Sequence, residues 1–326
     1  MDALILSSEG AYLDRSEFLA EAIADRLAEE AHAHMAPEAA EVTSIDEIRA
    51  VRPETMTSDE AVAFGDWAAD GSPVTLPGVP GPATNFGLHN RDLPTIWALD
   101  WLGRLVSEAG RPITWAQYLS ELVPRAWATG SALQTADLAN GAPAKSAAGF
   151  PTNKKKHDAA EQRFLAHSVG SVAMRKDTST ATRNDGPLFV FRLVGLVVDG
   201  NAVMVAPTPE AVVLLRDLRR ANASTVRPLP PEAWAAFSSH LERSSPEEIA
   251  MWRRVLNVLV DKPGRTAVAT RCSWWAGSIA ETNAMSYIAR GREWGLVEPK
   301  MVDGHYDLTE LGTSEVEVLK SSGKEP

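Results

Sequence analysis

Residues 294–312 read Trp294-Gly295-Leu296-Val297-Glu298, a turn that contains Asp303-Gly304, and then Tyr306-Asp307-Leu308-Thr309-Glu310-Leu311-Gly312. A glycine that follows a helical pattern is a usual helix end. Apolar runs on either side of an Asp-Gly pair are typical of a β-hairpin. The stretch therefore predicts the end of a helix, a short hairpin and the beginning of another helix.

Three helices are predicted before this hairpin. The first begins at Ser245, where a capping serine, Pro246 in the first turn and Glu248 three residues after the cap match a capping box. A short helix follows at about 266–275, and a third runs from about 278 to 294. The predicted order is three helices followed by a hairpin.

This pattern resembles the winged helix-turn-helix fold, and in particular the wing of MarR-type regulators, in which a helix ends in Gly-Leu-Val and the second wing strand leads into Leu-Thr-x-x-Gly. The resemblance covers residues from Ser245 to Leu319. It implies that the third helix lies in the major groove of DNA. Winged helices also serve as protein-contact modules, and the fold by itself does not decide between these functions.

Helical periodicity places Ala280, Ala284, Ile288 and Gly291 on the inner face of the third helix. The opposite face and its flanks carry side chains that can bind bases or phosphates. With basic residues elsewhere, the expected DNA-binding residues are Thr282, Asn283, Ser286 and Arg290 on the helix, Lys300 and His305 on the wing, Arg271 on the second helix, and Lys154, Lys155 and Lys156 in a polar loop. Glu281 and Glu293 oppose phosphate binding on the same helix.

Residues 91–221 predict a similar element order. Helices are expected at 92–109, from 114 and over 158–175, with a hairpin of strands 188–198 and 202–206 around Asp199-Gly200-Asn201 and a helix from Thr208 to Leu218. Residues 222–231 are expected to be a linker. The expected fold is mainly α with small β-hairpins (α+β), with winged-helix domains at 91–221 and 232–320.

Residues 1–90 are expected to form an acidic helical region, with a helix at 14–35 and a Pro/Gly-rich linker at 71–90. Residues 1–100 carry 19 acidic and 5 basic side chains, whereas residues 151–300 carry 15 acidic and 21 basic side chains. The overall charge of −11 is therefore unevenly distributed, and a basic body remains compatible with phosphate contact.

No enzyme is predicted, because the sequence lacks a phosphate-binding loop, a nucleophile elbow and a His-Glu-x-x-His zinc motif. The single cysteine, Cys272, excludes a disulfide within the chain and a cysteine-rich zinc site. No metal or cofactor is expected. Without a signal peptide or a long apolar segment, a cytoplasmic protein with no membrane association is expected.

The function that this pattern favours is binding of double-stranded DNA, either as a transcriptional regulator or as the DNA-contacting subunit of a larger complex. The alternative is a scaffold subunit whose winged helices bind a partner protein or a second copy of the chain. The acidity of the whole chain favours this alternative, whereas the polar third helix and the basic patches favour DNA.

Overall fold

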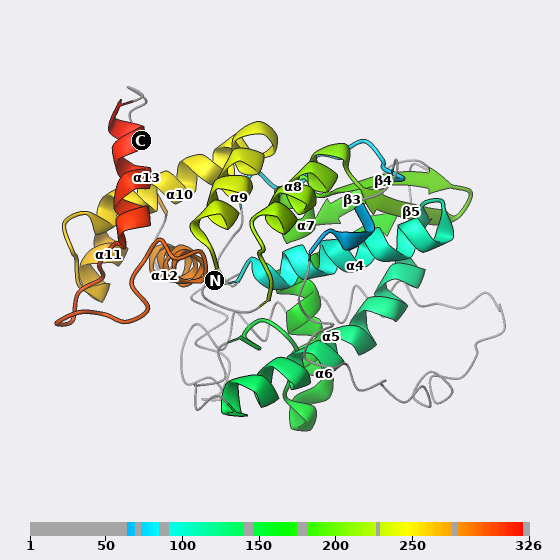
Figure 1. The fold of residues 1–326 in the computed structure, drawn as a ribbon, viewed down its shortest axis with the longest axis horizontal. Coiled ribbons are helices and arrows are strands. Elements are labelled where there is room, and N and C mark those ends of the chain that lie inside the picture. Colours follow the sequence, from blue (N-terminus) through cyan, green and yellow to red (C-terminus); the bar gives the residue numbers. More distant parts are fainter. Residues whose placement is uncertain are drawn as a thin grey trace, which may run out of the picture. The chain divides into compact units, whose positions relative to one another are not determined.

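The computed structural model describes residues 64–68, 73–84, 91–139, 146–174, 182–225, 229–275 and 279–321, which all lie in one compact unit, Pro53–Pro326. They form mostly helices with two small antiparallel sheets (Figure 1). This confirms the predicted mainly α class. The helix expected at 14–35 lies outside the described residues. Among the residues described, no helix combines the length and apolarity needed to cross a membrane.

Residues 91–225 form the N-terminal module. Its sheet has the strand order β1–β5–β4, and both pairs are antiparallel. The elements that build it are α4 (Leu93–Ala109), β1 (Ile113–Thr114), α5 (Trp115–Ala139), α6 (His157–Phe164), β4 (Val194–Asp199), β5 (Ala202–Pro207) and α8 (Pro209–Arg220). The hairpin expected around Asp199-Gly200 is β4–β5, and Thr208 caps α8 by accepting a hydrogen bond from the Ala211 amide.

The first strand of this hairpin begins later than expected. Residues 188–190, predicted to be strand, belong to the helical turn α7 (Pro187–Val190). Pro187 is fixed at a helix-compatible φ and follows Gly186, which has a φ of 105°. A second hairpin, β2 (Ser171–Met174) and β3 (Thr182–Asp185), lies between α6 and α7 and replaces the end of the helix predicted over 158–175. Helical structure stops at η3 (Leu165–Val169), before Gly170 with a φ of 113°.

Part of the Pro/Gly-rich stretch packs on the N-terminal module. The Leu76 amide donates a hydrogen bond to the Pro207 carbonyl at 3.0 Å, and Gly78 forms an antiparallel bridge with Gly195. A Cβ on Gly195 would approach the Pro77 carbonyl to well under 3.0 Å. Residues 76–78 therefore lie against the sheet at the beginning of β4, and Gly195 permits this close approach.

Residues 246–321 form the C-terminal module, and α9 (Pro231–Ser244) lies before it. The helices are α10 (Pro246–Leu259), α11 (Arg265–Arg271), α12 (Ile279–Glu293) and α13 (Glu310–Ser321). Between α12 and α13 the chain forms isolated bridges instead of longer strands. His305 pairs with both Gly264 and Val302. The third strand segment, which contains His305, therefore lies between the first segment at Gly264 and the second at Val302, just as β5 lies between β1 and β4 in the N-terminal module.

The two predicted domains, 91–221 and 232–320, share one continuous hydrophobic core. Ser245 does not form the expected capping box, because its hydroxyl donates to the Val190 carbonyl at 2.6 Å. Asp92 immediately precedes α4 but makes no side-chain capping bond. The Ser245 and Asp92 side chains instead form hydrogen bonds with residues far away in the sequence.

His240 on α9 is fully buried, and its Nε2 lies 2.8 Å from the Phe191 carbonyl. Burial lowers the pKa of His240 from 6.5 to about 4. The unfolded chain therefore takes up this proton at a higher pH than the folded chain. This part of the stability is complete above pH 6.5 and is lost as the pH falls toward 4.

Urea unfolding should measure this effect. Between pH 6.5 and pH 5 we expect His240 to remove about 1.5 kcal/mol from the free energy of unfolding, at a rate that approaches about 1.4 kcal/mol for each pH unit. The His240→Gln variant should lack this part of the pH dependence, although it is less stable at pH 7. Parallel pH profiles for the two proteins would contradict a neutral buried histidine.

Candidate nucleic-acid interface

The third helix of the C-terminal module, α12, is mostly covered. Thr282 is exposed at its first turn, but Asn283, Ser286 and Arg290 are buried, with exposed fractions of 0%, 6% and 0%. The expectation that these three side chains contact DNA is therefore corrected. The helical pattern located the inner face correctly, but the opposite face of the helix packs against residues of α4 and α10.

Arg290 is the centre of this contact. Its Nε donates to Asp92 Oδ1 at 2.8 Å, and its Nη2 lies 2.8 Å from Glu248 Oε1. Trp294 Nε1 donates to the other Asp92 oxygen at 2.7 Å, and the Tyr287 hydroxyl donates to Glu248 Oε2 at 2.8 Å. Asp92 immediately precedes α4, so the network joins the N-terminal module to the C-terminal module.

Glu293 strengthens the same junction. One of its oxygens accepts hydrogen bonds from the Asp92 and Leu93 amides, at 2.5 and 3.2 Å, at the beginning of α4. A carboxylate at a helix N-terminus is favoured by the helix dipole. On the sequence alone Glu293 opposes phosphate binding, but in the structure its carboxylate caps another helix.

The electrostatics of Arg290 agree with a structural role. Burial works against its charge, but the carboxylates of Asp92 and Glu248 outweigh burial and raise the pKa of Arg290. The guanidinium also lies over the rings of Trp252 and Tyr287, each 4.8 Å from the ring centroid. Burial, with a further contribution from Glu248, raises the pKa of Tyr287 well above its usual value. All these groups are held inside the fold.

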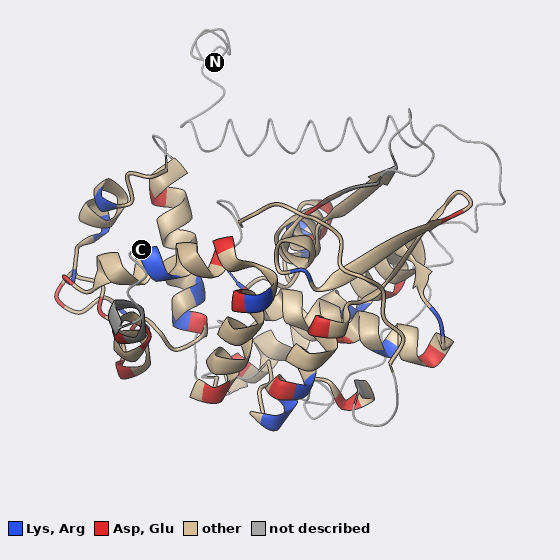
Figure 2. Cartoon of the chain, turned by 90° about the horizontal axis from the view of Figure 1, so that it is seen from above, with Lys and Arg blue, Asp and Glu red and all other residues tan. Residues whose placement is uncertain are grey.

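The other predicted residues of the C-terminal module are exposed. Lys300 and His305 lie on the segments after α12, and Arg271 ends α11. Cations on this side of the module are matched by acids, in the pairs Arg271–Asp261 at 2.9 Å, Arg265–Glu281 at 2.8 Å and Lys262–Asp307 at 2.6 Å. Acidic and basic side chains are interspersed over the described elements (Figure 2). This surface therefore offers little net attraction for phosphate.

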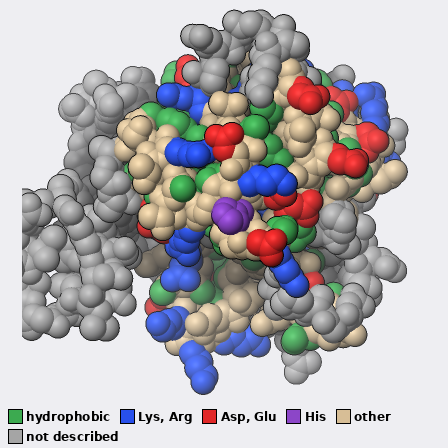
Figure 3. Space-filling view, turned by 90° about the vertical axis from the view of Figure 1, so that its left-hand side faces the viewer, with side chains coloured by type: hydrophobic (Ala, Val, Ile, Leu, Met, Phe, Trp, Pro, Cys, Tyr) green, Lys and Arg blue, Asp and Glu red, His purple; other side chains and the backbone are tan. Residues whose placement is uncertain are grey.

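Lys154, Lys155 and Lys156 have a different environment. The sequence predicted a loop here, but the three residues form a single 3₁₀ turn, η2 (Lys154–Lys156), called the lysine turn below. All three side chains are exposed, and no ion pair within the described part of the chain includes them. Figure 3 is turned about the vertical axis from Figure 1, so the level of α5 and α6 is the lower part of both views. Lys and Arg side chains gather in that lower part of Figure 3.

The lysine turn leads directly into α6, the third helix of the N-terminal module. Unlike α12, α6 is exposed over most of its length, and only Phe164 is buried. Arg163 is also exposed and adds a cation, whereas Asp158 and Glu161 are the acids on this helix. The three lysines were predicted as a phosphate-binding site, but the exposed helix behind them was not, although polar and small residues at most positions of 157–163 indicate an exposed helix.

Close packing fixes the segment before the lysine turn. A Cβ on Gly130 of α5 would approach the Pro151 carbonyl to under 3.0 Å, so this glycine allows residues 150–152 to lie against the helix. Phe150 packs against Trp97 with ring centroids 5.2 Å apart. After the turn, the His157 ring stacks on Trp127 at 4.7 Å. The lysine turn is thus held at both ends.

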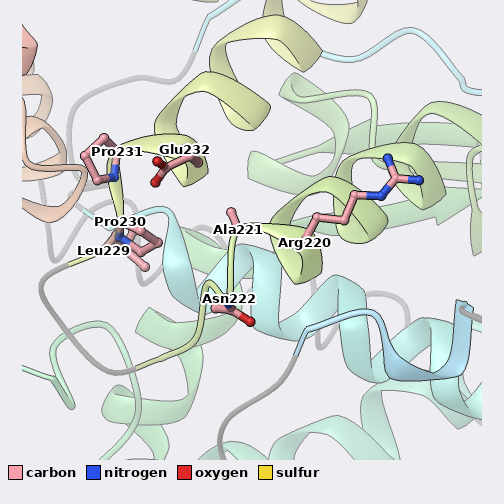
Figure 4. A pocket seen from close by; sticks show the side chains of 7 residues that line it. All are labelled: Arg220, Ala221, Asn222, Leu229, Pro230, Pro231 and Glu232. Carbon is pink, nitrogen blue, oxygen red and sulfur yellow. The ribbon is translucent and has the colours of Figure 1, made fainter.

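A pocket of about 750 Å³ lies where α8 ends and α9 begins. Its lining residues are Arg220, Ala221, Asn222, Leu229, Pro230, Pro231 and Glu232. Figure 4 shows that the Arg220 side chain points away from Glu232, and Arg220 is paired with Asp217. These residues do not converge on a common point, so the pocket is not assigned a reaction.

Comparison with known proteins gives no relative: no protein-family model, curated protein or solved structure matches the chain. The residues themselves therefore carry the functional argument.

Proposed function

We propose that the chain is a DNA-binding protein built on two winged-helix modules and that the N-terminal module makes the principal contact. The C-terminal module follows the order helix, strand segment, helix, helix and two strand segments, and its third strand segment lies between the other two. The N-terminal module has the same order and the same central strand, with the hairpin β2–β3 and the helical turn α7 inserted between α6 and β4. This order supports the winged-helix proposal. In such proteins the third helix is the one that approaches DNA, and in the N-terminal module the third helix is α6.

The observation that carries the proposal is the contrast between the two third helices. The second half of α12 is enclosed around Arg290, whereas α6 is open and begins at three exposed lysines. Lysines that neutralise phosphates release counterions, which supplies most of the affinity of a protein for DNA of any sequence. The C-terminal module is then the partner that fixes the N-terminal module in place. Such a protein can act as a regulator or as the DNA-contacting subunit of a complex.

The test is fluorescence anisotropy of a labelled random-sequence duplex at about 50 mM and about 200 mM salt. The variant replaces Lys154, Lys155 and Lys156 with alanine. We expect its affinity at the lower salt to fall at least about tenfold, and the slope of log K against log salt to become less steep by about 0.9 for each lost phosphate contact.

A matched control removes the same charge from the C-terminal module, through alanine at Lys262, Arg265 and Arg271. Because these cations are paired with acids, we expect its affinity to change by less than about twofold. Equal losses in the two variants would show that only net charge matters. No loss in the lysine variant would refute the assignment to the N-terminal module.

A second candidate function is protein contact through the C-terminal module. Ile279, Met301 and Val302 have exposed fractions of 53%, 37% and 52%, and the neighbouring cations are paired with acids. Apolar side chains among matched charges suit a protein surface better than phosphate. The same titration separates the two functions, because the absence of salt-dependent DNA binding would leave protein contact as the supported one.

A further inference from the structure

We propose that the lysine turn enters a groove of duplex DNA and binds phosphates on both sides of it, so that the chain binds duplexes independently of their sequence. This inference rests on the proposed function and specifies its ligand. It follows from the shape of the turn, from the chemistry of lysine and from the aromatic residue beside it.

The shape of the lysine turn is the first observation that supports groove entry. A 3₁₀ helix has three residues in each turn, so three consecutive side chains point in directions about 120° apart. If such a turn lay flat on the surface, at least one of its side chains would be covered. Lys154, Lys155 and Lys156 are all exposed. The turn therefore projects from the module and presents positive charge on several sides at once.

The turn is held by hydrogen bonds of its own backbone to Asn153. Asn153 accepts a hydrogen bond from the Lys155 amide through its side chain at 3.2 Å, and from the Lys156 amide through its carbonyl at 3.1 Å. These bonds leave the three ammonium groups out of the local hydrogen bonding. The cations remain available to a ligand that surrounds the turn, such as the two rows of phosphates that border a groove about 12 Å wide.

The chemistry of the lysine side chain limits what the turn can recognise. An ammonium group is a compact charge on a flexible stem and lacks the planar fork with which arginine reads guanine or phosphate in two parallel bonds. Phosphate contacts position a protein on DNA but carry no sequence information. Three lysines in a row therefore favour backbone binding over base reading.

The aromatic side chain beside the lysine turn favours a duplex over a single strand as the ligand. Proteins that bind single strands stack the bases on exposed aromatic rings. Beside the lysine turn the aromatic side chain is Trp127, and its ring is already stacked on His157 with an interplanar angle of 11°. Within the described residues, the face of Trp127 that lies toward His157 is therefore occupied, which favours groove entry over base stacking.

The experiment measures anisotropy with the full chain at about 50 mM salt, using two labelled duplexes of unrelated sequence and one single strand of the same length. We expect the two duplexes to bind within about twofold of each other, and the single strand at least about tenfold more weakly. Single variants Lys154→Gln, Lys155→Gln and Lys156→Gln should each weaken both duplexes by the same factor and reduce the salt slope by about 0.9.

Gln162→Ala is the companion variant, because Gln162 is an exposed side chain of α6 that can read a base edge. A strong preference between the two duplexes that is lost in Gln162→Ala would overturn the inference and leave DNA binding in place. Equal or tighter binding of the single strand would overturn groove entry. Failure of every probe to bind would reject the proposed function together with the inference.

Discussion

Replacing Arg290 with methionine is expected to lower the free energy of unfolding by about 3–5 kcal/mol, because the change leaves two buried carboxylates without their cation. Asp92 and Glu248 both lie 2.8 Å from the guanidinium, and all three side chains are fully buried. Methionine keeps most of the side-chain length, so the loss of charge dominates over the loss of packing. Urea denaturation at pH 7 measures the effect.

Arg271→Met is the matched control. Arg271 also pairs with an aspartate at 2.9 Å, but its side chain is 44% exposed, so we expect a loss of at most about 1 kcal/mol. Adding Asp92→Asn to Arg290→Met should restore part of the stability, because it removes one of the unpaired charges. If Arg290→Met cost no more than Arg271→Met, the network around Arg290 would not hold the modules together.

Arg290 also shows where sequence reasoning stops. Its partner Asp92 lies 198 residues earlier in the chain. A helical pattern separates an apolar face from a polar one, and it placed Ala284 and Ile288 inside correctly. It cannot show that a second element covers the polar face. Buried polar residues look the same in a sequence as exposed ones, so Asn283, Ser286 and Arg290 were assigned to the DNA-facing side of the helix.

The glycine and Asp-Gly turn signals were more dependable than the capping box at Ser245, because each depends on the backbone conformation of one or two residues. Gly295 ends α12 with a φ of 73°, and Asp303 and Gly304 have the left-handed φ values, 49° and 79°, that an Asp-Gly hairpin turn requires. Gly200 has a φ of 58° at the turn between β4 and β5. The error at 188–190 arose from the apolar run itself, since a buried helical turn and a strand have similar composition.

The lysines illustrate an intermediate case. Their number and type are visible in the sequence, and so is their value for phosphate binding. Their geometry depends on Gly130 and Phe150, which hold the preceding segment against α5 and α4. Predicting a projecting turn would have required these contacts between distant residues. The sequence therefore predicts which residues make up the site, but it does not predict that they form a projecting turn.

Gly312→Val is expected to cost about 3 kcal/mol or more, or to prevent folding, because a Cβ at this position would lie well under 3.0 Å from the Leu296 carbonyl oxygen. The obstacle is backbone, which cannot rotate away. Thr309 fixes the approach: its amide donates to Leu296 and its hydroxyl to Gly295, and the hydroxyl accepts from the Gly312 amide. These contacts explain physically why glycine follows Leu-Thr-x-x in this stretch.

Ser314→Val is the control for Gly312→Val, since Ser314 is an exposed position of the same helix, α13. It introduces the same β-branched side chain, so it measures the small loss of helix propensity, a few tenths of a kcal/mol. Circular dichroism followed by urea denaturation compares the two variants. If Gly312→Val were within about 1 kcal/mol of the control, α13 could dock without glycine, and the Leu-Thr-x-x-Gly pattern would lose its structural explanation.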